Sequence, residues 1–429
     1  MGFLSELNWR GLVHQTAGDE LDAFLKTPGR AAYAGFDPTG DSLTIGNFIP
    51  IKMLMHWQRA GHTPIVVMGG GTGLIGDPSG KEAERQLRTR EEIDHNINAQ
   101  RRIYERFLNF EGENAATIVN NIDWLQPLGY IEMLRDIGKH FSINMMVQKE
   151  SVAERLNNRE QGISYTEFSY MILQAYDFLH LKREYNCAVQ LGGSDQFGNI
   201  VAGMDLIRRT GHNEEEKQSF AITCPLVTRA DGGKIGKTET GAVWLTADRT
   251  SPYMFYQYWI NADDRDVEQF LKWFTMMPRD QIEAVVVEHK RSPELRSAQR
   301  ALAEHMTTLV HGHDEMRRVE AASEALFSGD VRALDRDLLA EVFADVPSST
   351  HARAGLEGDG MALLELLPLT SLASSKREAR EFLGNGAISI NGEKASGIDH
   401  ALQTTDLLHG NMILLRRGKK AWHALQFDG

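Results

Sequence analysis

The chain of 429 residues has only two cysteines, Cys187 and Cys224. Two thiols are too few for a disulfide framework or a four-cysteine zinc site. Long apolar runs are also missing, since no stretch approaches the roughly 20 residues that cross a bilayer. The first residues lack a basic segment followed by an apolar one, as a secretory signal would require. We therefore expect a cytoplasmic protein without a membrane partner.

Positive charge is scarce as well. The chain has 46 basic and 59 acidic residues, and its net charge of −13 argues against nucleic acid as a partner of the whole surface. The segment 371–429 differs, with eight basic and six acidic residues. A mildly basic tail on an acidic body is typical of a separate binding module, although an excess of two charges is small. With 42% hydrophobic residues, the composition excludes disordered and collagen-like chains.

Short apolar runs alternate with helical patterns over the first half of the chain. Strands are predicted at 31–36, 64–68, 117–120 and 187–191, and helices at 45–59, 81–108 and 165–181. Alternation of this kind indicates a Rossmann-like α/β fold, with a parallel sheet covered on both faces. Ligands of such folds bind at the carboxyl ends of the strands, where the strand order reverses.

The second half of the chain has a different pattern. Residues 251–346 are helical throughout, and 347–360 have the Pro, Ser and Gly content of a linker. In 361–429, helical patterns at 363–367 and 376–383 precede a strand at 387–390, which Asn-Gly turns bracket. The sequence therefore predicts four parts: an α/β domain (1–250), a helical domain (251–346), a linker (347–360) and a small α+β module (361–429).

The first candidate site follows the strand 31–36. The chain turns at Asp37-Pro38, and a helix is predicted to begin near Thr44. The N-terminus of a helix attracts phosphate, and Thr39, Thr44 and Asn47 add hydrogen-bonding side chains. The alternative is an ordinary turn with Thr44 as the helix cap, and the motif by itself favours that alternative.

A glycine-rich run, 69–81, follows the second strand. It contains a literal G-x-G-x-x-G pattern, but Pro78 and Gly80 interrupt the helix that a dinucleotide site requires there. What remains is one carboxylate, Asp77, beside two cations, Lys81 and Arg85. This set suits a small cationic group next to a polyphosphate, and a surface loop shaped only by its glycines is an equal alternative.

Two further segments carry chemistry. In 231–238, Lys234 and Lys237 lie three residues apart between glycines, which suits a mobile phosphate-binding loop or, alternatively, a solvated hairpin tip. In the helix 165–181, Tyr170, Gln174 and Asp177 share one face. Such a polar row either lines a ligand pocket or bonds to other protein groups, because leaving it buried and unpaired costs about 1–3 kcal/mol per group.

Taken in order, the motifs resemble those of bacterial tyrosyl-tRNA synthetases, which are class I aminoacyl-tRNA synthetases. The resemblance includes the Gly-Asp-Pro-Ser-Gly-Lys run, the segment 192–200 (Gly-Gly-Ser-Asp-Gln-Phe-Gly-Asn-Ile) and the Lys-Ile-Gly-Lys-Thr run. The tail from about residue 361 resembles the S4 RNA-binding module. The chain departs from the family pattern at Thr44 and Asn47, where histidines are usual, and at Phe197, where tryptophan is frequent.

This resemblance implies ligation of L-tyrosine to tRNA(Tyr) through tyrosyl-adenylate, with ATP and Mg²⁺ as co-substrates, no protein metal site and a homodimer. It implies catalytic roles for Thr39, Thr44, Asn47, Lys81, Arg85, Lys234, Lys237 and Thr238. The implied tyrosine-binding residues are Tyr33, Asp77, Tyr170, Gln174, Asp177 and Gln190. The implied ATP-binding residues are Gly35, Asp37, Gly46, Gly193, Asp195, Gln196 and Lys237.

Three rival interpretations remain at this point. Tryptophanyl-tRNA synthetases resemble this chain in fold and reaction, but Tyr33 with Asp177 suits a phenol and the S4-like tail is unusual for them. A dinucleotide-dependent oxidoreductase is weakened by the interrupted glycine fingerprint. A non-catalytic RNA-binding protein would leave the lysine loop and the polar helix face without a use.

Overall fold

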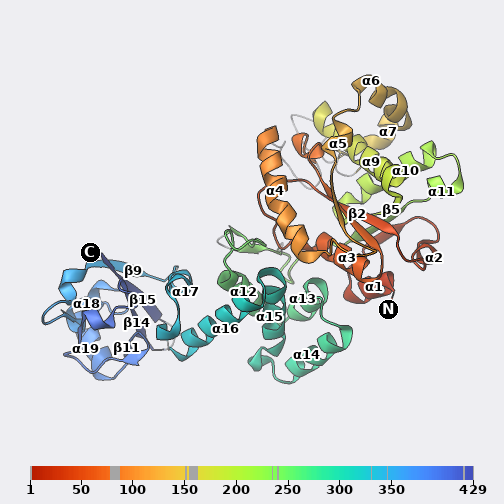
Figure 1. Ribbon diagram of the computed structural model, residues 1–429. Helices are drawn as coiled ribbons and strands as arrows, with labels where there is room; N and C mark the ends of the chain where they lie inside the picture. The colour runs from red at the N-terminus through yellow and green to blue at the C-terminus, as the bar shows by residue number, and fades with distance from the viewer. Residues whose placement is uncertain are drawn as a thin grey trace. The chain divides into compact units, whose positions relative to one another are not determined.

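The computed structural model describes residues 2–77, 87–149, 152–153, 163–233, 235–238, 241–329, 331–344, 346–418 and 421–428 (Figure 1). The chain forms two compact units. The first comprises Met1–Thr250 and Tyr258–Val310, and the second comprises Ser251–Gln257 and His311–Gly429. The helical segment predicted at 251–346 is thus divided between the two units.

A mixed sheet of six strands forms the centre of the first unit, in the order β1-β6-β5-β2-β3-β4. All neighbours pair in parallel except β1 and β6, which are antiparallel. The four predicted strands are confirmed, whereas the short polar β1 and the buried β6 had no prediction. The strands are β1 (Gln15–Ala17), β2 (Ala31–Phe36), β3 (Thr63–Met68), β4 (Thr117–Asn120), β5 (Cys187–Gly193) and β6 (Phe220–Cys224).

Helices cover both faces of this sheet, as the alternation along β2 illustrates. Tyr33 packs against Phe178 of α9, with ring centroids 5.4 Å apart. Phe36, which points to the opposite face, packs against Tyr104 of α4 at 5.0 Å. The predicted parallel α/β fold is therefore confirmed. The long covering helices are α3 (Phe48–Arg59), α4 (Arg90–Phe107), α9 (Tyr165–Tyr185) and α10 (Phe197–Thr210).

Local signals explain the ends of α9, the helix with the predicted polar face. Ser164 precedes it, and its hydroxyl accepts a hydrogen bond from the Glu167 backbone N–H. Asn186 ends it in the left-handed conformation, with φ of 49°. Between these caps, Tyr170 and Asp177 are buried on the face that the sequence indicated. The predicted helix, and the shared face of its polar residues, are confirmed.

The first unit also contains shorter elements and a group of helices from the second half of the chain. The shorter elements are α1 (Phe3–Arg10), α2 (Leu21–Phe24), α5 (Ile122–Leu125), α6 (Tyr130–Glu132), α7 (Ile143–Met146), α11 (Glu214–Lys217), β7 (Lys237–Thr238) and β8 (Gly241–Ala242). The later helices are α12 (Pro252–Ile260), which crosses the boundary of the units, α13 (Val267–Phe274), α14 (Arg279–Arg291) and α15 (Ser297–His311). Within the described ranges, no helix is long and apolar enough to cross a membrane.

Two buried cations fix the C-terminal end of α13 to the helices of the α/β part. The Arg10 guanidinium of α1 donates to the carbonyl oxygens of Lys272, Thr275 and Met277 at 2.6–3.0 Å. Lys52 of α3 donates to the same Lys272 carbonyl at 2.7 Å. Both side chains are fully buried, and burial lowers the pKa of Lys52 well below its usual value. The partial negative charge at a helix C-terminus offsets part of this cost, so α13 is firmly attached.

The second unit contains two helices and a small α+β module. The helices are α16 (His313–Ser328) and α17 (Arg336–Val342). The main sheet of the module has the order β12-β11-β14-β15-β9. Its strands are β9 (Ser348–Ala352), β11 (Ile388–Ile390), β12 (Glu393–Lys394), β14 (Met412–Arg417) and β15 (Ala421–Asp428), and the remaining elements are β10 (Met361–Ala362), β13 (Ala401–Leu402), α18 (Leu363–Leu366) and α19 (Lys376–Gly384).

The predicted linker at 347–360 is wrong, because this segment belongs to the module. Strand β9 pairs in parallel with β15, from Ser348 opposite Ala424 to Ala352 opposite Asp428. Leu356 is fully buried in the core of the module. The polar composition misled the prediction because β9 is an edge strand whose Ser349 hydroxyl pairs with the buried His423 ring at 3.0 Å.

Candidate active site

A cavity of about 500 Å³ lies at the carboxyl ends of β2 and β5. The strand order reverses between these two strands, so the cavity occupies the position that the sequence predicted for a ligand. Many predicted site residues, from distant parts of the chain, line this one cavity. They are Tyr33, Gly35, Asp37, Thr39, Thr44, Gly46, Asn47, Asp77, Tyr170, Gln174, Asp177, Gln190, Gly193, Asp195 and Gln196.

The outcome differs for the predicted cationic residues, most of which the structure does not describe. Lys81, Arg85 and Lys234 lie outside the described residues. Lys237 and Thr238 form β7, which pairs with β8 in a hairpin. Among the described residues of the segment 231–238, only the last two thus belong to a hairpin. This pairing does not decide between a solvated tip and a phosphate-binding loop.

One end of the cavity holds a buried carboxylate, Asp177. Its Oδ2 accepts from the side chain of Asn121 at 2.9 Å, and its Oδ1 accepts from the indole N–H of Trp124 at 2.7 Å. Burial raises the pKa of Asp177 to about 7, and these two hydrogen bonds act in the opposite direction by favouring the carboxylate. The carboxylate is thus buried and held by two donors.

Two buried polar atoms beside this carboxylate lack partners among the described residues. They are the hydroxyl of Tyr33 and the side-chain oxygen Oε1 of Gln190, and both residues line the cavity. Burial and the neighbouring Asp177 raise the pKa of Tyr33 well above its usual value, so the hydroxyl stays protonated. Buried polar groups are almost always hydrogen-bonded, so a polar ligand at the Asp177 end of the cavity would satisfy both atoms.

Asn121 and Trp124 escaped the sequence analysis, although their position offered a signal. They follow β4, at the same edge of the sheet as the ends of β2 and β5. Asn121 also accepts from the Gly71 backbone N–H at 2.7 Å, and it donates to the Thr72 hydroxyl at 3.0 Å. These contacts connect the glycine-rich run to Asp177.

A second group of carboxylates lies along the same cavity. The Tyr170 hydroxyl donates to Asp37 Oδ2 at 2.9 Å, and the Thr72 hydroxyl donates to Asp37 Oδ1 at 2.7 Å. The amide of Gln196 donates to Asp77 at 2.8 Å. Burial, followed by the charges of Asp37 and Asp77, raises the pKa of Tyr170 well above its usual value. This part of the cavity is therefore negative and suits a cationic group.

Amide side chains connect this negative region to α10. Asn199, which the sequence analysis missed, donates to the Gln174 carbonyl oxygen at 3.0 Å. Gln174 in turn donates to Gln196 at 3.3 Å. The three amides orient one another, so the position of Gln174 depends on α10 as well as on its own helix α9.

Thr44 and Asn47 bond to each other at the start of α3. The backbone N–H and the hydroxyl of Thr44 both donate to Asn47 Oδ1, at 3.1 and 2.8 Å. Helix α3 begins at Phe48, and no side chain caps it. The alternative in which Thr44 is the helix cap is therefore wrong. Because its carbonyl oxygen is engaged, the Asn47 carboxamide can donate to a ligand through its NH₂ group.

Close packing explains the glycines that precede Asp77. A Cβ atom at Gly69 or Gly70 would collide with the side chains of Asp37 and Asn120, and one at Gly71 would lie 2.8 Å from Leu125. After them the described chain makes only a short 3-10 turn, Thr72–Leu74, where a dinucleotide site needs a helix. The glycines thus bring the backbone close to the cavity wall.

Comparisons with known proteins indicate the family of this chain. The family of class I tRNA synthetases for tryptophan and tyrosine matches residues 26–328, and the C-terminal domain of tyrosine--tRNA ligases matches 339–425. The tyrosine--tRNA ligases of Bacillus caldotenax and Geobacillus kaustophilus (strain HTA426) are each 49% identical to this chain over 429 residues, with both chains fully covered.

Solved structures agree as well. A C-terminally truncated mitochondrial tyrosyl-tRNA synthetase of Aspergillus nidulans matches with a TM-score of 0.68 and 29% identity, over 76% of this chain and 94% of that chain. The tyrosyl-tRNA synthetase of Archaeoglobus fulgidus, complexed with L-tyrosine, matches at 0.54 with 16% identity, over 74% and 99%. At that identity it supports the fold alone.

The fold, the cavity at its switch point and the first family match define a class I aminoacyl-tRNA synthetase. Within that class, the full-length relatives and the C-terminal match show that the chain belongs to the tyrosine--tRNA ligase family.

Proposed function

We propose that the cavity at the ends of β2 and β5 is where this chain joins tyrosine to ATP. The chain is a tyrosine--tRNA ligase: it uses ATP to form tyrosyl-adenylate with release of pyrophosphate, and it transfers the tyrosyl group to the 3′ end of tRNA. The observation that carries the assignment of the cavity is a pair of buried polar atoms, on Tyr33 and Gln190, that have no hydrogen-bond partner among the described residues and lie in the same cavity as the Asp177 carboxylate.

The substrate phenol fits the Asp177 end of the cavity. A phenol donates one hydrogen bond and accepts another, so it can donate to Asp177 while the Tyr33 hydroxyl donates to it. Tyrosine bound in this way places its ammonium group toward the other carboxylates. There Asp77, Gln174 and Tyr170 hold it, and Asp37 supports Tyr170 through their hydrogen bond. The negative charge of this region favours the cationic ammonium.

No protein nucleophile takes part in the activation step. The carboxylate of tyrosine attacks the α-phosphate of ATP, a P–O bond forms, and pyrophosphate leaves with the bonding electrons. The contribution of the protein is to position the two reactants and to stabilise the charge that develops on phosphate. Thr39, the Thr44–Asn47 pair and the backbone at Gly35, Gly46 and Gly193 line the ATP side of the cavity. Asp195 and Gln196 line it as well, on the ribose side.

The cations of two segments complete the ATP site in this proposal. Lys81, Arg85, Lys234 and Lys237 neutralise the triphosphate, and Thr238 adds a hydroxyl beside them. Mg²⁺ enters with ATP as part of the substrate, bound mainly by phosphate oxygens and water. The basic residues of the C-terminal module contact tRNA phosphates, and their contribution therefore decreases as salt is added.

Tyrosine-dependent exchange of labelled pyrophosphate into ATP is the experiment that tests this function. We expect exchange with full-length protein, ATP, Mg²⁺ and tyrosine, and none with tryptophan in its place, since an indole has no acceptor for the Tyr33 hydroxyl. Exchange with tryptophan alone, or no exchange with either amino acid, would contradict the proposal.

Truncation should separate activation from tRNA charging. The first family match ends at residue 328 and the second begins at 339, and α16 ends at Ser328. A chain that ends at Gly329 keeps every residue of the cavity. We therefore expect exchange within about twofold of the full-length rate, and aminoacylation of tRNA reduced at least tenfold, because the phosphate-binding cations are lost. Efficient charging by the shortened chain, or loss of both activities, would show that the module is not separable.

A second copy of the chain is the proposed partner of an apolar surface on the first unit. Tyr130, Ile131, Leu134, Ile143, Met145 and Tyr165 are 41–72% exposed. The hydroxyls of Tyr130 and Tyr165 lie 3.5 Å apart, so the two ends of this set adjoin. Exposed apolar surfaces of this kind typically mark protein interfaces. Sedimentation velocity of the full-length protein tests whether two copies form a homodimer. We also propose that the protein is located in the cytoplasm.

A further inference from the structure

The lysine loop, residues 229–238, contacts the segment 37–47 that follows β2. We call this segment the first motif, and the contact is made by Gly236. Gly236 has a φ of 80°, and a Cβ atom there would lie 2.8 Å from Ile45 and 3.8 Å from the Gly46 nitrogen. Val243 links the two segments, because its N–H donates to the Gly236 carbonyl and its carbonyl accepts from the Ile45 N–H. The backbone just before Lys237 is thus held beside the ATP side of the cavity.

Two side chains from the helical part of the first unit hold this loop on either side of Lys234. Asp266 accepts a hydrogen bond from the Ala230 backbone N–H at 2.8 Å. The hydroxyl of Tyr258, on α12, accepts one from the Gly236 N–H at 3.1 Å. The first half of the loop is closed further by Asp231, which accepts from the Gly233 N–H at 2.8 Å and pairs with Arg229.

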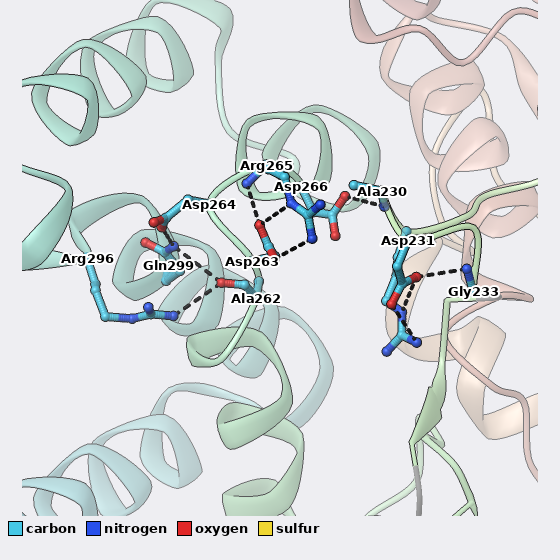
Figure 2. A network of polar contacts seen from close by, with 11 residues as sticks. Ala230, Asp231, Gly233, Ala262, Asp263, Asp264, Arg265, Asp266, Arg296 and Gln299 are labelled. Atoms are coloured by element: carbon cyan, nitrogen blue, oxygen red, sulfur yellow. Dashed lines mark hydrogen bonds and ion pairs between the residues drawn. The ribbon is translucent and has the colours of Figure 1, made fainter.

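The position of Asp266 shows that its side chain serves the loop and not its own helix. It immediately precedes α13, where aspartate usually caps the first turn through its side chain, yet no such capping bond is present. Its carboxylate is buried and points instead to Ala230 (Figure 2). The usual local bond is given up for a contact 36 residues away in sequence.

Side chains of the segment 296–299 hold the turn that carries Asp266. Arg296 donates to the carbonyl oxygen of Ile260 at 2.8 Å. It also donates to the carbonyl oxygen of Ala262 at 3.2 Å, and Gln299 donates to Asp264 at 2.6 Å (Figure 2). The other end of α13 is fixed by the buried cations Arg10 and Lys52. Lys52 belongs to α3, which begins directly after the first motif, and Asp266 directly precedes α13. The loop and the first motif are therefore both attached to the connected helices α3 and α13.

We propose that Asp266 and Tyr258 are positioning residues that set the lysine loop at the ATP side of the cavity for the activation step. Neither side chain lines the cavity, so both act through the loop backbone. The role assigned to the loop rests on the proposed function of the cavity, whereas the anchoring itself is a property of the fold.

Three substitutions test the anchors by kinetics. Tyr258→Phe removes only the acceptor hydroxyl, Asp266→Ala removes the acceptor carboxylate, and Asp266→Asn keeps a carbonyl oxygen that can still accept from Ala230. With loss of one hydrogen bond per variant, we expect the maximal rate of pyrophosphate exchange to fall roughly 5-fold in the first two and to recover in the third. The dissociation constant for tyrosine should stay unchanged, because the loop does not touch the amino-acid end. Asp263→Asn is the matched control, because Asp263 lies in the same turn and the described hydrogen bonds of its side chain go only to Arg265.

A direct readout of the loop distinguishes this inference from the proposed function. Trypsin cleavage within 229–238, followed by mass spectrometry at low protease, reports how often the loop opens. We expect roughly 5-fold faster cleavage in Tyr258→Phe and Asp266→Ala, and the wild-type rate in Asp263→Asn. Wild-type cleavage rates in the first two variants, or equal losses in exchange rate and tyrosine affinity, would overturn the inference. If the wild-type protein shows no exchange, the proposed function fails, and the cleavage rates still decide whether the anchors exist.

Discussion

Asparagine in place of Asp177 is expected to lower kcat/KM for tyrosine about a hundredfold. A hydrogen bond to a charged group contributes about 1.5–3 kcal/mol, and the new amide would also direct its NH₂ group at a neighbouring donor, either Asn121 or Trp124. Tyr33→Phe removes a single neutral hydroxyl and should cost about fivefold. Both variants should discriminate less between tyrosine and phenylalanine. Rejection of phenylalanine by a site that hydrogen-bonds a phenol is already a known property of tyrosyl-tRNA synthetases.

The pH dependence of tyrosine binding offers a second measurement on the same residue. Burial raises the pKa of Asp177 to about 7, so the carboxylate that accepts the phenol hydrogen is lost as pH falls below that value. Tyrosine affinity of the wild-type protein should therefore decrease between about pH 8 and pH 6, and the decrease should be absent in Asp177→Asn. If Asp177→Asn and Tyr33→Phe both discriminate between tyrosine and phenylalanine as the wild-type protein does, with KM for ATP and thermal stability intact, the assignment of the phenol site is refuted.

Alanine in place of Lys237 is expected to slow formation of tyrosyl-adenylate about 10²–10³-fold, the usual cost of removing one group that stabilises transition-state charge. Lys237 directly follows Gly236, the glycine that contacts Ile45. It belongs to a loop that we expect to close on the triphosphate. Tyrosine affinity should change less than twofold, because the amino-acid end of the cavity is formed by other segments.

Stopped-flow measurement of adenylate formation, beside equilibrium binding of tyrosine, separates the two effects for Lys237→Ala. Lys237→Arg keeps the charge and is the matched control, from which we expect a smaller loss. A normal rate of adenylate formation combined with weaker tyrosine binding would place Lys237 at the amino-acid end and contradict the proposal.

Local pattern was sufficient for much of the first unit. The short runs at β2 and β4 predicted both strands with their observed limits, because short apolar segments bounded by turn residues favour strands. The helical period placed Tyr170 and Asp177 on one buried face of α9. The interrupted glycine run weakened the case for a dinucleotide site. The motifs themselves, read in order, indicated the tyrosine--tRNA ligase family that the comparisons then showed.

Contacts between distant segments were beyond such patterns. Asn121 and Trp124 bond to Asp177 across more than 50 residues, and no period of helix or strand relates these positions. Asp266 looks like an ordinary helix cap until the fold brings Ala230 beside it. The segment 347–360 reads as a linker because the partners of its hydroxyls, such as His423, lie far along the chain.

The sequence by itself therefore determined the parallel strands β2 to β5, the helix α9, the family and most residues of the cavity, because each of these depends on local composition and spacing. Only the tertiary structure decided which polar groups pair and which stay unpartnered. Burial and pairing are properties of neighbours in space, so the buried Asp177 carboxylate, the Tyr33 hydroxyl without a partner in the described part of the chain, and the anchored lysine loop appear only once the strands and helices have packed.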